Sequence, residues 1–350
     1  MMEGENKRIV FLGKTGAGKS SLANTIFGVQ NLFQVSHKST FGTNICDSKT
    51  RNICNRNITL IDTPGVFDTD PRSTDLSPEL LKCVQECAPG PHAFLLVLKV
   101  EKYTKQEQAV VDVILKYFSE EALKYTTVVF THGDNLPEKV KIKDWASENK
   151  SLETLIQKCG GRCHVFDNKR WKDSQDPYRN NQVQINELLN TIDQTVQRNG
   201  GKCYTNDMLQ MIDNELQQEM KNISCSSNLT LADVQQKAKQ VVYAKLMKNM
   251  EGALVGALLG ALLGVGALVT LAVTCSPGVF QYVAAAVAGA GGGGVIGGLV
   301  GAWASGKWSS PTEAVRDSVE FLKEVQPLVE QLNQTVNAGK ALAAAASLLV

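Results

Sequence analysis

The sequence predicts an α/β fold with a mainly parallel sheet between helices, followed by a C-terminal α-helical region and a hydrophobic helical hairpin. Apolar runs alternate with helical patterns from residue 8 to about residue 195. These runs are rich in Val, Ile, Leu and Phe and hardly alternate with polar residues, as expected of strands buried on both faces. Residues 252–306 contain no charged side chain. The first two observations predict the sheet, and the third predicts the hairpin.

The expected strands and helices follow one another in the order typical of a parallel sheet that is covered on both faces. Strands are expected at 8–12, 58–62, 93–100, 126–130 and 163–166. Helices are expected between them at 19–28, 77–88, 105–123 and 148–161.

The composition divides the chain into four segments: an α/β domain at 1–204, an amphipathic helical extension at 205–250, a hydrophobic Gly-rich membrane hairpin at 251–306 and a helical tail at 307–350. Within the extension, the Thr230 hydroxyl is expected to cap a second helix through the amide of Asp233.

The overall charge and the cysteines exclude some classes of protein. A formal net charge of +1 gives no global surface for nucleic acid. The nine cysteines form no CxxC pair, which favours reduced thiols in a cytosolic protein over a zinc site. The charged N-terminus runs directly into a strand and does not resemble a secretory signal.

The uncharged segment is long enough to cross a bilayer. A helix over its first 24 residues, at about 1.5 Å per residue, would be roughly 36 Å long against a hydrocarbon core of about 30 Å. Flanking lysines favour insertion with both ends on the cytosolic side of an intracellular membrane. Glycines recur every four residues along one helix face, so a partner backbone can approach closely. The alternative is a Gly/Ala-rich helical hairpin buried within a soluble oligomer.

A candidate phosphate-binding loop follows the first strand. Gly13-Lys14-Thr15-Gly16-Ala17-Gly18-Lys19-Ser20 matches G-x-x-x-x-G-K-[ST] between a strand and a helix, and Ser21 continues the set. Backbone N–H groups of such a loop surround phosphate oxygens, and the helix N-terminus adds partial positive charge. Lys19 is expected to reach the β- and γ-phosphates.

The expected ligands of Mg²⁺ come from three places in the chain. They are the Ser20 hydroxyl, Thr43 in preference to Thr40, and Asp62, which opens the sequence Asp-Thr-Pro-Gly after the second expected strand. The Gly65 amide, at the end of this sequence, is expected to meet the γ-phosphate. DxxG alone is a common turn, but its position after the phosphate loop favours the functional interpretation.

The order of these motifs predicts a base-reading loop after the strand at 126–130. Thr131-His132-Gly133-Asp134 stands there, and an aspartate can accept two parallel hydrogen bonds from guanine, a pattern that adenine does not offer. His132 replaces the usual lysine; it offers a flat face but no permanent charge. Asp167 and Asn168, after the last strand, are candidates for further contacts with the purine.

Together these motifs resemble the immunity-associated GTPases (GIMAP family). The resemblance rests on GKTGAGKSSLANTIFG, LIDTPGVFDT, GPHAFLLVLKVEKYTKQEQ, THGDNL and CHVFDNK, and covers about 8–205. It implies a septin-like (paraseptin) P-loop GTPase three-layer fold, GTP or GDP with Mg²⁺, self-association of G domains and, in many members, a C-terminal membrane anchor. His132-Gly133 and Asp167 depart from the usual family residues at those positions.

The resemblance also bears on catalysis. Some family members carry an arginine that acts across a dimer, where this chain has Lys102, and apolar Val66 follows DTPG where many GTPases place a water-orienting glutamine. Lys102 is the only catalytic candidate and a poorer clamp for phosphate than arginine. Slow hydrolysis, or none, is therefore expected.

The favoured function is a membrane-anchored, GTP-dependent assembly switch that forms homo-oligomers or associates with related GTPases through its G domain. The first alternative is a dimer-activated GTP hydrolase acting in membrane trafficking or remodelling. The second is a P-loop protein that binds ATP.

Overall fold

The computed structural model describes residues 6–35, 45–65, 77–101, 119–172, 174–226, 229–249 and 262–263. The predicted hairpin at 251–306 and the tail at 307–350 lie outside these residues, apart from Leu262 and Leu263. Among the described residues, none of the helices is long and apolar enough to span a bilayer.

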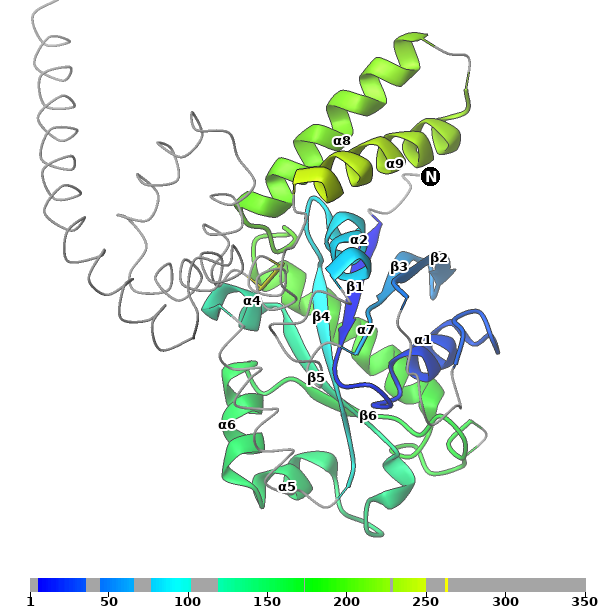
Figure 1. Ribbon diagram of the computed structural model, residues 1–350. Helices are drawn as coiled ribbons and strands as arrows, with labels where there is room; N and C mark the ends of the chain where they lie inside the picture. The colour runs from blue at the N-terminus through cyan, green and yellow to red at the C-terminus, as the bar shows by residue number, and fades with distance from the viewer. Residues whose placement is uncertain are drawn as a thin grey trace, which may run out of the picture.

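A six-stranded sheet in the order β2-β3-β1-β4-β5-β6 forms the centre of the α/β domain (Figure 1). The strands are β1 (Lys7–Leu12), β2 (Asp47–Ile53), β3 (Arg56–Asp62), β4 (Ala93–Lys99), β5 (Thr126–Thr131) and β6 (Cys163–Val165). Neighbouring strands are parallel except β2, which pairs antiparallel with β3 at one edge. The five predicted strands are present, and β2 is an addition.

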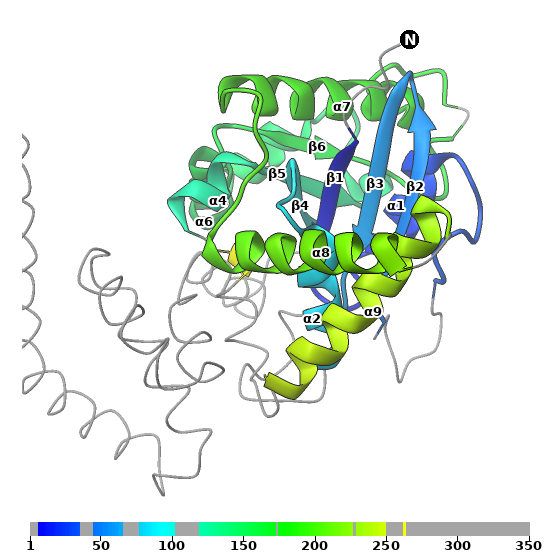
Figure 2. The same ribbon diagram turned by 90° about the horizontal axis from the view of Figure 1, so that it is seen from above.

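Side chains alternate between the two faces of the sheet, and each face has its own core. Ile9 and Phe11 of β1 pack with α1 (Lys19–Phe27) and α7 (Asn181–Arg198). Val10 and Leu12 of the same strand contribute to the core on the other face, with α2 (Ser77–Cys87) and the extension. Figure 2 shows α7 on one side of the sheet, with α2, α8 and α9 on the other. The α/β layers are those of a P-loop GTPase-type fold.

Short helices connect the strands at the β5–β6 end of the sheet. They are α4 (Glu120–Lys124), the 3₁₀ turn η1 (Gly133–Asn135), α5 (Ile142–Ser147) and α6 (Lys150–Lys158). The helix predicted at 148–161 corresponds to α6, which Glu148 and Asn149 separate from α5. The Asn149 side chain accepts hydrogen bonds from the amides of Ser151 and Leu152, which starts a new helix there. Of the helix predicted at 105–123, the part before residue 119 lies outside the described residues.

The extension forms two helices, α8 (Asp207–Ser226) and α9 (Leu231–Asn249), which pack on each other and on α2. The Thr230 hydroxyl accepts a hydrogen bond from the Asp233 amide at 3.2 Å, so the predicted cap is confirmed. From α9, Lys239 forms an ion pair with Glu86 at 2.7 Å, and the Lys239 carbonyl accepts from the side-chain amide of Gln85. The extension is thereby attached to the helix that follows the DTPG sequence.

One pair of cysteines differs from the expectation of reduced thiols. Cys46, just before β2, and Cys83, in α2, form a disulfide with their Cα atoms 5.6 Å apart. Sequence spacing did not indicate this pair, because 37 residues separate its members. Folding brings β2 and α2 together, and the Cys46 amide also donates to the Glu79 carboxylate of α2 at 2.8 Å.

Candidate functional site

The phosphate-loop candidate connects β1 to α1 at the carboxyl end of the parallel strands. Gly16 and Gly18 have φ angles of 74° and 89°, a region that favours glycine, and Gly18 precedes the first residue of α1. A Cβ on Gly13 would lie 2.5 Å from the carbonyl oxygen of Val97 in β4. The loop thus lies against the sheet where no side chain would fit. Thr15 and Gly16 are exposed, whereas Ala17 is buried.

Lys19 and Ser20 lie in the first turn of α1 and are both buried. The Lys19 ammonium donates to the carbonyls of Gly13 and Lys14 at 2.9 and 3.0 Å, so it is held across the mouth of the loop. Ser21 follows with a half-buried side chain, and its carbonyl accepts from the Thr25 hydroxyl.

Ser20 and Asp62 meet beneath this loop. The Ser20 hydroxyl donates to Asp62 Oδ2 at 2.5 Å, and the other oxygen, Oδ1, is buried without a hydrogen-bond partner among the described residues. Burial raises the pKa of Asp62 to about 6, although Lys19 and Ser20 act to lower it. A buried carboxylate oxygen beside a hydroxyl and a phosphate-type loop is a donor set that fits Mg²⁺.

The DTPG sequence lies directly against the phosphate loop. A Cβ on Gly65 would lie 2.0 Å from Thr15 Oγ1 and 2.5 Å from the Thr15 amide nitrogen, so only glycine fits there. The buried Thr63 hydroxyl donates to the Phe11 carbonyl at 2.7 Å, which fixes the start of the turn to β1. The Gly65 amide was expected to meet the γ-phosphate; the structure brings Gly65 to the phosphate loop, and its contact with phosphate stays a prediction.

The candidate guanine loop begins at the end of β5. The Thr131 hydroxyl donates to the Ala17 carbonyl at 2.7 Å and so joins this loop to the phosphate loop. His132 has a left-handed backbone, with φ 58°, and its ring nitrogen Nδ1 lies 3.0 Å from Thr131 Oγ1. The Gly133 amide donates to the Phe166 carbonyl at 3.0 Å, and a Cβ on Gly133 would lie 2.5 Å from the Trp171 ring.

Asp134 lies next to the loop that follows β6. Its carboxylate forms an ion pair with Arg170 at 3.2 Å and shares a hydrogen bond with the Asp167 carboxyl. This hydrogen bond, followed by burial, raises the pKa of Asp134 above its ordinary value. Burial alone would raise the pKa of Asp167, but hydrogen bonds led by the Arg170 amide hold it below its ordinary value.

The two candidates after β6 take different directions. Asp167 Oδ1 accepts from the amides of Lys169 and Arg170, so its carboxylate caps its own turn beside Asp134. Asn168 Oδ1 accepts from the Thr25 hydroxyl of α1 at 2.9 Å, which places its side chain on the phosphate-loop helix.

Several residues extend the predicted set, and two predicted residues lie outside the described part of the chain. Thr131 and Trp171 hold the guanine loop, and the Lys99 ammonium would lie 4.0 Å from a Cβ on Gly16. Thr131 opens the TxxD sequence, so its type and position were a usable signal; Trp171 and Lys99 gave none. Thr43 and Lys102 lie outside the described residues, and their roles stay predictions.

A family model described as the AIG1 family matches residues 7–223, which contain all of these loops. The chain belongs to the AIG1 family. Among its relatives in this family, Immune-associated nucleotide-binding protein 4 of Arabidopsis thaliana is 30% identical over 252 residues, which are 70% of this chain and 75% of the relative. The human GTPase IMAP family member 8 is 30% identical over 200 residues, which are 57% of this chain and 29% of that protein.

The resemblance to the immunity-associated GTPases is therefore confirmed. A separate comparison with solved structures includes Toc33 of Arabidopsis thaliana in complex with GDP and Mg²⁺. Toc33 is 22% identical with a TM-score of 0.42, and the match covers 55% of this AIG1-family chain and 85% of Toc33.

Proposed function

We propose that this AIG1-family protein binds GTP and GDP with Mg²⁺ and acts as a self-assembling switch on the cytosolic face of an intracellular membrane. The phosphate loop, from Gly13 to Ser21, surrounds the phosphates, and Lys19 supplies the charge that faces them. Asp134 reads guanine through its carboxylate, with His132 and Gly133 beside the base and Asp167 and Asn168 completing the rim.

Ser20, Asp62 and Thr43 hold the Mg²⁺. When bound, the ion neutralises charge on the β- and γ-phosphates. The protein's own part is to hold the Ser20 hydroxyl and the Asp62 carboxylate together, as their 2.5 Å hydrogen bond does in this structure. Displacing the Lys19 ammonium from the Gly13 and Lys14 carbonyls would free it for a phosphate oxygen.

The observation that carries the proposal is the hydrogen bond from Thr131 to the Ala17 carbonyl. It fixes the distance between the loop that would read the base and the loop that would hold the phosphates, which a nucleotide must span. Two unrelated turns would not need such a connection, because each could be stable alone.

Nucleotide specificity tests the proposal. Asp134→Ala should abolish the preference for GDP over ADP, because the paired acceptor for guanine is removed, while Asp176→Ala, at an exposed aspartate, should retain it. Affinities can be measured by displacement of a fluorescent GDP analogue. If ATP displaces bound GDP as well as GTP does in the unaltered protein, the guanine assignment is wrong and the ATP-binding alternative holds.

Assembly and turnover follow from the same site. GTP would order the segments that carry Thr43 and Gly65 and so favour association of G domains. Phosphate release measured against protein concentration separates the switch from the dimer-activated hydrolase, in which Lys102 would act across the dimer. A steep rise with concentration supports the hydrolase, and a flat negligible rate supports the switch.

The membrane anchor has a separate test. Residues 252–306 fused to a soluble reporter should carry the reporter into the membrane fraction, and a reporter that stays in the cytosol contradicts the anchor.

A further inference from the structure

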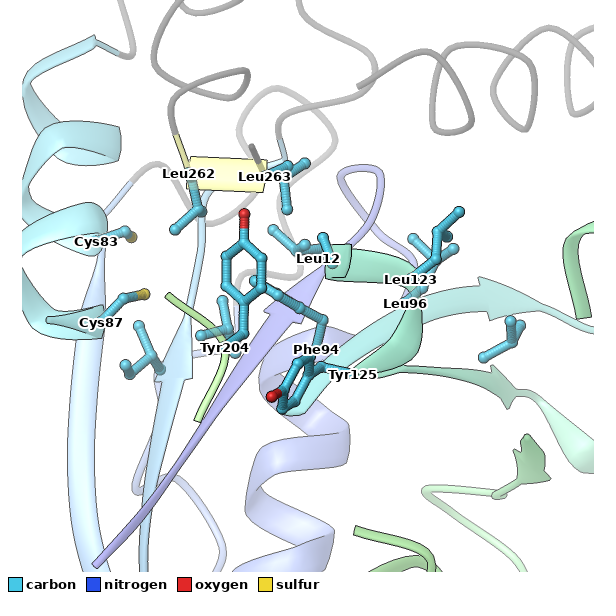
Figure 3. Close-up of a cluster of buried hydrophobic side chains, with 14 of the residues drawn as sticks. Leu12, Cys83, Cys87, Phe94, Leu96, Leu123, Tyr125, Tyr204, Leu262 and Leu263 are labelled. Atoms are coloured by element: carbon cyan, nitrogen blue, oxygen red, sulfur yellow. The ribbon is translucent and has the colours of Figure 1, made fainter. Parts of the chain in front are cut away.

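Two residues of the uncharged segment are buried against the α/β domain. Leu262 and Leu263 are 0% exposed and belong to the hydrophobic core on the α2 face of the sheet. They share this core with Leu12 at the end of β1, Leu96 of β4 and Leu123 of α4. Figure 3 shows the ring of Tyr204 rising from below with its hydroxyl directed toward the Leu262–Leu263 segment. We call this place the leucine site.

Polar contacts hold the backbone of the same two residues. The Ser119 amide donates to the Leu263 carbonyl at 3.0 Å, and the Asn206 side-chain amide donates to the Leu262 carbonyl at 3.3 Å. The same Asn206 amide also donates to the Tyr204 hydroxyl at 3.1 Å. Both the side chains and the carbonyls of the two leucines are therefore accommodated, which apolar collapse alone would not explain.

A bilayer would take the same leucines. In a membrane, an apolar stretch lies in lipid and its backbone groups hydrogen-bond within the stretch. In the leucine site, the side chains and carbonyls of Leu262 and Leu263 are instead held by the α/β domain and Asn206. One copy of Leu262 and Leu263 cannot occupy both places. We propose that the leucine site is a docking site for the chain's own uncharged segment, so that docking on the G domain and insertion into a membrane are alternative states.

The inference rests on the membrane anchor in the proposed function, and it adds a state in which the uncharged segment is docked on the G domain instead of inserted in lipid. Its position is informative, because Leu12 directly precedes Gly13 of the phosphate loop, and α2 carries Cys83 and Cys87 beside the docked leucines in Figure 3. Leu262 and Leu263 thus share a core with the strand and helix that flank the candidate nucleotide loops.

Hydrogen exchange of the full chain without membranes tests the docking. The Ser119 amide should exchange about tenfold faster in L262A/L263A than in the unaltered protein, because its acceptor is no longer held. L258A/L259A is the matched control, since it removes the same side chains from the preceding G-A-L-L repeat of the sequence. Unchanged exchange in L262A/L263A overturns the docking. Protection that rises with protein concentration would mean that a second copy supplies the leucines, which overturns it also.

Flotation with phosphatidylcholine vesicles tests the competition. Asn206→Asp keeps the oxygen that accepts from the Leu209 amide at the start of α8 but replaces the donor to Leu262 with a carboxylate. We expect its vesicle-bound fraction to exceed that of the unaltered chain several-fold. Asn180→Asp, the same change at the start of α7, should not differ from the unaltered chain. In vesicle-bound protein the Ser119 amide should lose its protection.

The outcomes separate the two ideas. A bound protein whose Ser119 amide stays protected overturns the competition while the anchor stands. If neither the unaltered chain nor Asn206→Asp binds vesicles, the anchor in the proposed function is wrong and the competition falls with it, whereas the exchange experiment still decides the docking.

Discussion

The hydroxyl of Thr131 donates a 2.7 Å hydrogen bond to the carbonyl oxygen of Ala17, and both residues are buried. This contact joins the end of β5 to the phosphate loop, 114 residues earlier in the chain. It connects the candidate guanine loop to the phosphate loop in a chain that has His132 rather than lysine at the next position.

Thr131→Val should weaken GDP binding by about fivefold, because a buried hydrogen bond contributes about 1 kcal/mol and the Ala17 carbonyl would lose its donor. Thr131→Ser should retain most of the affinity. Thr154→Val is a suitable control, since the Thr154 hydroxyl also donates to a carbonyl but on the exposed face of α6. Equal affinity of Thr131→Val and the unaltered protein, measured by calorimetry, would show that the two loops are positioned independently.

Asp167→Asn should strengthen GDP binding in mildly acidic solution. The hydrogen bond with Asp167 and the charge of Asp167 raise the pKa of Asp134, whereas ionised Asp134 is the form that accepts from guanine. Arg170 acts in the opposite direction and remains in the variant. The unaltered protein should therefore lose affinity as the pH falls towards the raised pKa of Asp134, and Asp167→Asn should lose less. A variant with the same pH profile as the unaltered protein would exclude Asp167 as the cause.

Gly65→Ala should prevent tight binding of nucleotide while leaving the sheet folded. The added methyl group would overlap Thr15 Oγ1 and the Thr15 amide nitrogen, so either DTPG or the phosphate loop must move. Circular dichroism should show a folded protein, and displacement of labelled GDP should show the loss. Normal GDP affinity in a folded Gly65→Ala would contradict the close approach.

Reduction should destabilise the protein through the Cys46–Cys83 bridge. For the 37-residue separation, the chain-entropy estimate is about 4 kcal/mol. A reducing agent should lower the melting temperature of the unaltered protein but not that of Cys46→Ala. Cys54→Ala, at an exposed free thiol, should keep the dependence on the reducing agent. If unreduced, unfolded protein shows all nine thiols as reactive, rather than the seven outside the bridge, the bridge does not form in solution.

Stability should fall with acid between about pH 6.5 and pH 4. Burial is the main cause that lowers the pKa of His92 and His164 to about 4, so the folded state keeps them neutral after the unfolded chain has taken up protons. The free energy of unfolding is therefore unaffected above the ordinary pKa of about 6.5. It falls as the pH drops from about 6.5 to about 4, by up to about 3 kcal/mol per histidine. Urea unfolding of His164→Gln should show a shallower pH dependence, and an identical slope would rule out His164.

The parallel strands and the order of the loops could be predicted because both depend on local patterns. The antiparallel strand β2 was missed since its sequence, DSKTRNI, is polar and half exposed, as an edge strand can be. Helix α7 was not predicted, although Ile185, Leu188, Ile192 and Val196 repeat at helical spacing and are buried. Here the signal was present but was masked by a high content of Asn and Gln.

Within the site, residue types and spacing identified Ser20, Asp62 and Gly65 as candidates. The structure brings Ser20 to Asp62 and Gly65 to the phosphate loop, and their roles toward Mg²⁺ and phosphate stay predictions. The order of motifs does not show which side chains of one loop contact residues of another. Neither the Asp134–Asp167 hydrogen bond nor the packing of Trp171 on Gly133 could therefore be predicted. The Cys46–Cys83 bridge was hidden for the same reason, because its two residues meet only through the fold.

Because Gly65 contacts Thr15, the residues at positions 15 and 65 cannot be exchanged independently of each other. A larger residue at 65 is excluded by the backbone nitrogen of residue 15 as well as by its side chain, so no substitution of Thr15 alone would make room for it. Anyone who grafts this phosphate loop onto another scaffold, or builds chimaeras of related chains with a junction between the two, must therefore transfer both segments from the same parent.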